Sequence, residues 1–302
     1  MMLRSLRLFL LLMFVTGFIN YADAQQKKRP AAHWVDPDTS TPLGTEYKTF
    51  HSQASGGEVS YLIWLPPGYE TDSNRRWPVV YWLHGLGGDQ RTGVKCFLPQ
   101  LIDAVAAGTA PPVIAVFANG MVDSFYHNSP DGKWPIENMV INDLVPHIDA
   151  TYRTISQRHA RAIEGYSMGG YGTAYLGFKY PQIFGVVSIM AGALFEEKSM
   201  NRHTDILDKM YGGEFKNWQD HHALRYVQKN AKYIREHSTV RLVCGEKDPL
   251  LPGNRLMDST LNQLNIKHTF DIVPDIAHSS MKFYEACGPK ICTWYTTVFE
   301  AE

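Results

Sequence analysis

The chain has 302 residues, of which 44% are hydrophobic, and its formal net charge is −1. A chain of this length and apolar content can bury one large core, and single α/β domains of this size are common. The near-neutral charge lacks the basic excess that marks nucleic-acid-binding proteins, so we expect no nucleic-acid partner.

Residues 1–24 have the pattern of a secretory signal peptide. Two arginines precede an apolar run at residues 8–19, and small residues flank position 23 as in a cleavage site. The apolar run is shorter than a bilayer span requires, which disfavours the alternative of a membrane anchor. We therefore expect a secreted or periplasmic protein with no stable membrane insertion once the signal is removed.

Residues 25–44 are polar and contain three prolines, so we expect a tether before one domain at residues 45–302. In that domain strand-like and helix-like segments alternate, which is typical of an α/β fold with a mostly parallel sheet and helices on both faces. The first two strands are expected to pair antiparallel at one edge of the sheet. The expected strands are residues 46–52, 59–65, 77–83, 112–117, 158–163, 186–189, 240–243 and 268–273. The expected helices are residues 97–107, 138–152, 168–180, 254–264 and 279 onwards.

Residues 195–236 interrupt this alternation and form an expected insertion. The segment is rich in histidine, lysine, asparagine and tyrosine, and its apolar residues are scattered. An insertion at this position often serves as a lid or faces the substrate. Its apolar residues form no broad apolar surface.

Gly165-Tyr166-Ser167-Met168-Gly169 is a G-x-S-x-G motif between an expected strand and an expected helix. A serine on such a turn has its hydroxyl held out at the C-terminal edge of a sheet, where a base can reach it. The two glycines leave room for a strained turn and a close approach of strand and helix. Chance alone gives such a motif in roughly one chain in ten of this composition, and an ordinary helix N-cap is the alternative, so the context decides.

Three further segments supply what a nucleophilic serine needs. The Gly-rich loop 84–88 follows a strand and is expected to aim a backbone N–H at a developing oxyanion, which makes Leu86 and Met168 the expected donors. Asp248 follows one strand on a short loop, and His278 follows the next. The order serine, acid, histidine predicts a nucleophile, an orienting acid and a general base in Ser167, Asp248 and His278.

Other residues compete for two of these positions. Asp248 precedes a proline at a strand end, where the backbone leaves the sheet, although a plain turn aspartate is the alternative. The competing acids are Glu246, Asp271 and Asp275. The competing histidines are His203, His221, His222 and His268. His84 is expected to shape the Gly-rich loop, and the 12 histidines show no metal-ligand spacing.

The loop after the strand at residues 112–117 carries Phe125 and Tyr126 and should border the pocket. These rings are candidates for substrate binding, because they could clamp an aromatic or sugar ring. They could equally be internal packing.

Cys96, Cys244, Cys287 and Cys292 allow three full disulfide pairings. Cys287 and Cys292 span an expected turn and are the easiest local pair, with a bridge and free thiols as even alternatives. Cys244 ends an expected buried strand and could be a small core residue.

Together these segments resemble the esterase D family, which includes feruloyl and acetylxylan-type esterases, S-formylglutathione hydrolases and mycolyltransferases. The resemblance covers about residues 59–278, and it rests on the loop at 84–88, the G-x-S-x-G motif and the segments 61–69, 117–120 and 144–149. It implies an α/β-hydrolase that cleaves carboxylic esters with a Ser–His–Asp triad and no cofactor. The chain departs from the family at Glu164, where a small residue is usual, and at Ala277, where glycine is usual.

The expected activity is hydrolysis of short acyl or feruloyl esters, and the expected partners are a small ester or an acylated carbohydrate. Two alternatives stay open. One is an acyltransferase that uses the same triad with an acceptor alcohol. The other is a carbohydrate-binding homologue that kept the fold without catalysis.

Overall fold

The computed structural model describes residues 33–201 and 203–299, so the expected signal peptide at 1–24 and the first part of the tether lie outside the described residues. Within these ranges the strands form one eight-stranded sheet with the order β1-β2-β4-β3-β5-β6-β7-β8. The strands are β1 (Glu46–Ser52), β2 (Gly57–Trp64), β3 (Val79–Leu83), β4 (Ile114–Ala118), β5 (Arg161–Tyr166), β6 (Val186–Met190), β7 (Thr239–Gly245) and β8 (His268–Val273).

The sheet is antiparallel at one edge and parallel elsewhere. β1 pairs antiparallel with β2, and β2 pairs antiparallel with β4. From β4 through β3, β5, β6 and β7 to β8 every pairing is parallel. The expected antiparallel edge pair is confirmed, and the parallel strands bring their C-terminal ends to one edge, where ligands of open α/β sheets bind.

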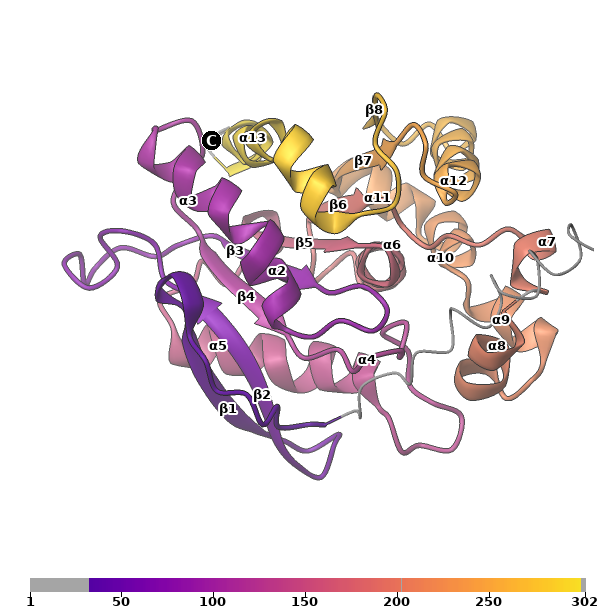
Figure 1. The fold of residues 1–302 in the computed structure, drawn as a ribbon, viewed down its shortest axis with the longest axis horizontal. Coiled ribbons are helices and arrows are strands. Elements are labelled where there is room, and N and C mark those ends of the chain that lie inside the picture. The colour runs from indigo at the N-terminus through magenta and orange to yellow at the C-terminus, as the bar shows by residue number, and fades with distance from the viewer. Residues whose placement is uncertain (1–32, 202, 300–302) are drawn as a thin grey trace, which may run out of the picture. The chain divides into compact units, whose positions relative to one another are not determined.

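The helices cover both faces of the sheet (Figure 1). Helix α13 packs against α2 and α3 on one face, while α6 contacts β5 and β6 and is in turn covered by α10. The main helical segments are α2 (Arg91–Cys96), α3 (Leu98–Ala106), α4 (Ile136–Asn138), the π-helix η2 (Met139–Leu144), α5 (Val145–Thr151), α6 (Met168–Lys179), α12 (Leu251–Gln263) and α13 (Ser280–Phe299). Single 3-10 turns, η1 (Pro42–Gly44) and η3 (Arg158–Ala160), precede β1 and β5.

Buried aromatic side chains fix the two faces, because successive residues of a strand point to opposite sides. Trp82 of β3 points to the α13 side, where its Nε1 donates a hydrogen bond to the Tyr284 hydroxyl at 3.0 Å. Its neighbour Tyr81 packs its ring against Phe184, with centroids 5.9 Å apart. The expected α/β architecture is therefore confirmed. β3 and β4 are continuous apolar runs, whereas buried Arg161 and Glu164 interrupt the apolar run of β5 and buried Arg241 interrupts that of β7.

Most boundaries differ from the expected ones by a few residues, and the helix expected at residues 138–152 is divided into α4, η2 and α5. The strand expected at residues 158–163 begins only at Arg161, because Arg158–Ala160 forms a 3-10 turn whose Arg158 carbonyl accepts from the Arg161 N–H. The same strand continues to Tyr166, so the nucleophile motif begins inside it. The helix expected at residues 97–107 is preceded by α2, which no periodic apolar pattern indicated.

The insertion folds into short helices, α7 (Glu197–Met200), α8 (Thr204–Tyr211), α9 (Phe215–His221), α10 (Ala223–Lys229) and α11 (Ala231–His237). Its scattered apolar side chains face inward. Leu207, Met210, Tyr211 and Trp218 are all buried, at 9% exposure or less. These four large apolar residues of the insertion are therefore used in packing, although Tyr233 of the same segment is 38% exposed.

Of the two alternatives for Cys287 and Cys292, a bridge and free thiols, the structure shows free thiols, because both residues lie in α13 and not in the expected turn. Five residues of helix span about 7.5 Å, which exceeds the Cα separation of a disulfide. All four cysteines are free and buried. Helix α13 continues through this Gly-Pro sequence, with Pro289 inside the helix. A Cβ on Gly288 would lie 2.4 Å from Gln100 Cγ, so the glycine permits close contact with α3.

Glu164, the unusual residue before the motif, is the centre of a buried polar network. Its Oε2 accepts hydrogen bonds from Ser188 Oγ at 2.7 Å, Arg241 Nη2 at 3.0 Å and the Tyr295 hydroxyl at 2.7 Å. Its Oε1 accepts from the Tyr284 hydroxyl at 2.8 Å. The network joins the nucleophile strand β5 to the acid strand β7 and to α13.

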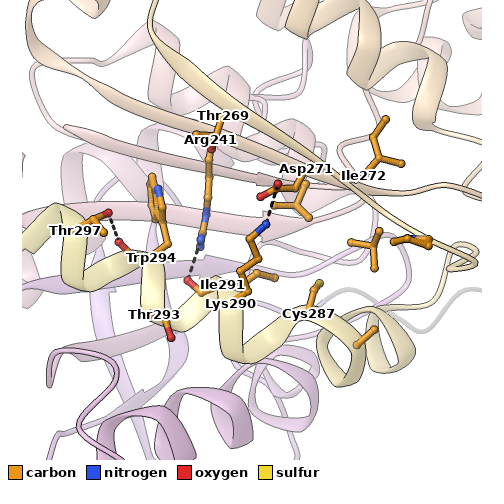
Figure 2. A pocket seen from close by; sticks show the side chains of 14 residues that line it. Arg241, Thr269, Asp271, Ile272, Cys287, Lys290, Ile291, Thr293, Trp294 and Thr297 are labelled. Atoms are coloured by element: carbon orange, nitrogen blue, oxygen red, sulfur yellow. Dashed lines mark hydrogen bonds and ion pairs between the residues drawn. The ribbon is translucent and has the colours of Figure 1, made fainter.

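Figure 2 shows the other end of this network, in a groove between the sheet and α13. Arg241 Nη1 donates to the Ile291 carbonyl of α13 at 2.8 Å, and its guanidinium lies 4.0 Å from the Trp294 ring centroid. Lys290 reaches back from α13 to Asp271 of β8 at 2.9 Å. These contacts hold the C-terminal helix on the strands that carry the acid and the histidine.

Candidate active site

Ser167 lies on the turn between β5 and α6 with a strained backbone. Its φ is 61° and its ψ is −116°, a region that L-residues enter only when the surrounding structure enforces it. The motif glycines permit this turn. A Cβ on Gly169 would lie 1.9 Å from the Leu83 carbonyl oxygen, and one on Gly165 would lie 2.5 Å from the Gly169 oxygen. The strand, the turn and the helix can approach this closely only with glycine at both positions.

The structure brings Ser167, His278 and Asp248 together in one hydrogen-bonded chain. Ser167 Oγ lies 2.9 Å from His278 Nε2, and His278 Nδ1 lies 2.7 Å from Asp248 Oδ2. The Asp248 side chain is wholly buried, whereas 31% of the His278 side chain is exposed. A carboxylate accepts only, so Nδ1 carries the proton and Nε2 is free to accept one from the serine hydroxyl.

The competing acids have other partners. Asp271 pairs with Lys290 at 2.9 Å, and Asp275 pairs with Lys247 at 2.7 Å with 80% of its side chain exposed. Glu246 accepts from the Asp275 N–H at 3.1 Å. Among the residues that the structure describes, Asp248 is the carboxylate that contacts His278.

The competing histidines are also placed elsewhere. His268 Nε2 lies 2.8 Å from Asp258, and His203, His221 and His222 belong to the insertion. The histidine that meets the serine is thus His278.

The Gly-rich loop lies directly against the serine. A Cβ on Gly85 would be 3.3 Å from Ser167 Cβ and 3.9 Å from its Oγ. The loop is held by bonds from the Gly88 N–H to the Gly85 carbonyl at 3.0 Å and from the Gly87 N–H to the Val122 carbonyl at 2.6 Å. Gly85 thus lies against Ser167 and directly precedes Leu86, while Met168 directly follows Ser167, so both expected oxyanion donors adjoin residues of this contact.

Met168 is the first residue of α6. An amide at this position has no acceptor within its helix and lies at the positive end of the helix dipole. It is therefore suited to a negative oxygen beside Ser167.

His84 stabilises the Gly-rich loop at residues 84–88. Its Nε2 accepts from the Gly120 N–H at 3.1 Å, so its Nδ1–H donates to the Gly85 carbonyl at 2.9 Å. Burial lowers the pKa of His84, which keeps the ring neutral in this bonding pattern. Both ring nitrogens are thus occupied by backbone groups.

Phe125 and Tyr126, the candidate substrate-binding residues, are buried, so of their two alternatives the structure favours internal packing over an aromatic clamp. Their exposed fractions are 2% and 0%. The Tyr126 hydroxyl donates to the His84 carbonyl at 3.1 Å, and a Cβ on Gly172 would lie 2.3 Å from its ring. Phe125 packs on Tyr171, with ring centroids 5.6 Å apart. Both have positive φ, and this turn directs their rings beneath the loop.

Tyr166 is a neighbour of the histidine that the sequence does not single out. Its ring is stacked on the His278 imidazole, with centroids 5.0 Å apart and an interplanar angle of 28°. Its hydroxyl lies 3.4 Å from His278 Nδ1. The period of two along β5 places Tyr166 on the same face as Glu164, toward α13, and that pattern could have revealed it.

Comparison with known proteins matches the Esterase family model to residues 52–287. The chain is 30% identical over 155 residues to an endo-1,4-beta-xylanase/feruloyl esterase of Xylanibacter ruminicola, covering 49% of this chain and 21% of that protein. It is 34% identical over 161 residues to an esterase of Mycobacterium tuberculosis, covering 52% of this chain and 34% of that one. The chain thus spans between about a fifth and a third of these relatives.

A solved ferulic acid esterase superposes with a TM-score of 0.73 at 22% identity, covering 84% of this chain and 98% of that one. This likeness establishes the α/β-hydrolase fold. In residues 33–201 and 203–299 we find no helix that combines the length and the apolar character needed to cross a membrane.

Proposed function

The chain belongs to the Esterase family of α/β-hydrolases, and we propose that it is an exported serine hydrolase of short acyl or feruloyl esters. The observation that carries this proposal is the chain Ser167–His278–Asp248, with bonds of 2.9 and 2.7 Å at the end of a strained turn. A neutral serine hydroxyl is a poor nucleophile, and this arrangement supplies the base and the orienting acid that it needs.

The reaction begins when Ser167 Oγ attacks the ester carbonyl carbon and His278 Nε2 takes the hydroxyl proton. The carbonyl oxygen becomes an oxyanion beside the backbone N–H groups of Leu86 and Met168, which stabilise it. His278 then returns the proton to the leaving alcohol, the C–O bond breaks, and an acyl-serine remains. A water molecule repeats the sequence on the acyl-serine and releases the carboxylic acid and free Ser167.

Asp248 acts on the histidine throughout. Its buried carboxylate holds the imidazole in the Nδ1–H tautomer and stabilises the imidazolium that forms in each half-reaction. A second bond, from the Leu250 N–H to Asp248 Oδ1 at 2.8 Å, fixes the carboxylate. This places the acid before substrate arrives, so little reorganisation is needed during reaction.

The substrate class rests on two supports. A relative at 30% identity is named an endo-1,4-beta-xylanase/feruloyl esterase, which favours acyl groups carried by a polysaccharide. The inward-facing apolar residues of the insertion leave little surface for a long acyl chain. Export rests on the signal-like pattern of residues 1–24.

The test is hydrolysis of p-nitrophenyl acetate and methyl ferulate by wild type and by Ser167→Ala. We expect kcat to fall by about 10⁵- to 10⁶-fold in the variant, since the triad acts as a unit. The variant should keep the wild-type melting temperature. Products measured with and without added sugar separate hydrolysis from transfer: acylated sugar as the main product would replace the hydrolase proposal with a transferase.

A further inference from the structure

One face of the His278 imidazole is covered by an aromatic ring. Tyr166 lies 5.0 Å from it, nearly parallel at 28°, and is only 4% exposed. Phe283 of α13 supports the tyrosine from a centroid distance of 5.3 Å. Strand β5 fixes the backbone of Tyr166, and α13 fixes its ring. The tyrosine ring therefore stays in place if the His278 imidazole rotates away from it.

The charge of the histidine changes during the proposed reaction, and the ring responds to that change. His278 is neutral before attack and cationic while the oxyanion exists. The face of an aromatic ring attracts a cation and has little preference for a neutral group. An interaction that is stronger in the transition state than in the ground state accelerates the reaction.

We propose that Tyr166 is a positioning residue that orients His278 and stabilises its protonated form through the face of its ring. This proposal rests on the proposed esterase function and deepens it. It assigns a role to the variable residue that precedes the nucleophile in the motif.

The hydroxyl of Tyr166 is a weaker candidate for this role than the ring. It lies 3.4 Å from His278 Nδ1, whereas Asp248 Oδ2 lies 2.7 Å from the same nitrogen. The single Nδ1 proton is thus already used by the carboxylate. A ring without a hydroxyl should therefore suffice.

Among the residues that the structure describes, Asp248 is the charged group beside Tyr166 and His278, and the other titratable groups near these two rings stay neutral. Burial raises the pKa of Tyr166 well above its ordinary value, and the nearby Asp248 carboxylate raises it further, so the phenol stays protonated. Burial also raises the pKa of Cys96 and that of Cys244 to about 12, so both thiols stay neutral. Asp248 is the charged group that faces both rings.

The experiment compares Tyr166→Phe, Tyr166→Leu and Tyr166→Met in steady-state hydrolysis of p-nitrophenyl acetate from pH 5 to 9. Tyr166→Phe should keep kcat and the pH profile of wild type. The leucine and methionine variants should lose between about two-fold and about thirty-fold in kcat with KM nearly unchanged. The acid limb of their kcat/KM profiles should move to lower pH by between about 0.4 and about 1.5 units, since the cation has lost its partner.

Phe50→Leu is a matched control. Phe50 of β1 stacks on His147 with the same centroid distance of 5.0 Å and an angle of 20°, but it lies outside the candidate site. Its removal should leave kcat and the pH profile unchanged. Tyr166→Met fills more of the volume of the removed ring than an alanine side chain would. It replaces Tyr166→Leu in the comparison if the leucine variant does not fold.

Two results would overturn the proposal. A loss in Tyr166→Phe as large as that in Tyr166→Leu would assign the role to the hydroxyl. A rate loss in Tyr166→Leu and Tyr166→Met with an unmoved acid limb would mean that the ring only fills space. Failure of the esterase function is recognised separately, because the wild-type protein would then hydrolyse p-nitrophenyl acetate and methyl ferulate no faster than Ser167→Ala does.

Discussion

The position of Asp248 shows how burial distinguishes a catalytic acid from a surface one. Asp248 and Asp275 both follow strands and lie close to His278 along the chain or in space. The Asp248 side chain is wholly buried on the imidazole, whereas 80% of the Asp275 side chain is exposed to solvent beside Lys247. A charge in water is screened and cannot hold a tautomer, so burial assigns the role to Asp248.

Asp248→Asn should lower kcat by about three to four orders of magnitude with little change in KM, because the acid acts on the imidazole in the transition state. Asp275→Asn is the matched control and should stay within about two-fold of wild type. Initial rates over a range of substrate concentration measure both. If the two variants exchange these behaviours, Asp275 is the acid.

At the scale of elements, β5 carries three connected features. Its side chains at positions 164 and 166 point toward α13, and Ser167 follows at its end. The buried Glu164 carboxylate therefore lies two residues before Tyr166, whose ring contacts His278. Removing one partner of a buried ion pair leaves the other charge uncompensated, so this strand has little tolerance for change.

Glu164→Ala should lower the free energy of unfolding by about 3 to 5 kcal/mol, because Arg241 would be left buried without its carboxylate. Urea denaturation followed by circular dichroism measures it. The control Glu58→Ala removes a half-exposed carboxylate near His51 and should change stability by less than about 0.5 kcal/mol. Equal effects in the two variants would mean that the buried network does not stabilise the fold.

The docking of the insertion on α6 is a second element-scale feature, built on buried histidines. His127 Nε2 lies 3.1 Å from the Tyr171 hydroxyl and 3.0 Å from that of Tyr211. Burial, then the charge of Lys179, then His221 and His222, hold the pKa of His127 well below its ordinary value. Burial likewise lowers the pKa of His222 to about 4. Both rings are neutral in the folded protein at neutral pH.

Stability should therefore fall on acidification. The unfolded chain protonates these histidines near pH 6.5, whereas the folded protein protonates His222 only near pH 4 and holds the pKa of His127 well below its ordinary value, so the stabilisation present above pH 6.5 is lost as the pH falls below it. Thermal melts from pH 8 to pH 4 measure this loss. His127→Gln should make the melting temperature less dependent on pH, because glutamine does not titrate. His51→Gln, on exposed β1, should leave this pH dependence unchanged. Equal slopes in all three proteins would contradict this origin.

At the scale of the whole molecule, the order of the serine, the acid and the histidine along the chain predicts the site better than the type of any single residue does. The strands at residues 79–83 and 268–273 and the order serine, acid, histidine follow from apolar runs and turn residues, which are local in the sequence. The stack of Tyr166 and the burial of Phe125 and Tyr126 depend on positive φ values and on α13, which is distant in sequence. The alternation of side chains along β5 indicates which face Tyr166 occupies, but no local pattern indicates its stack on His278 or the burial of Phe125 and Tyr126. The Gly-Pro pair in α13 predicted a turn for the same reason. The contact of its glycine with α3 is distant in the sequence.

Acyl-chain preference is a property of the whole molecule, since the insertion and the sheet edge together bound the substrate. With the larger apolar residues of the insertion buried, each methylene that finds no apolar wall forfeits up to about 0.8 kcal/mol of binding. We expect kcat/KM to be highest for p-nitrophenyl acetate or butyrate and to fall at decanoate and palmitate. A maximum at decanoate or palmitate would show a lipase-like pocket.

Active-site labelling tests whether Ser167 is the nucleophile. A fluorophosphonate forms a stable adduct only with an activated serine, and peptide mapping by mass spectrometry locates it. We predict one adduct, on Ser167, in wild type and in the control Ser55→Ala, and none in Ser167→Ala. An adduct on another serine, together with hydrolysis that survives Ser167→Ala, would contradict the account.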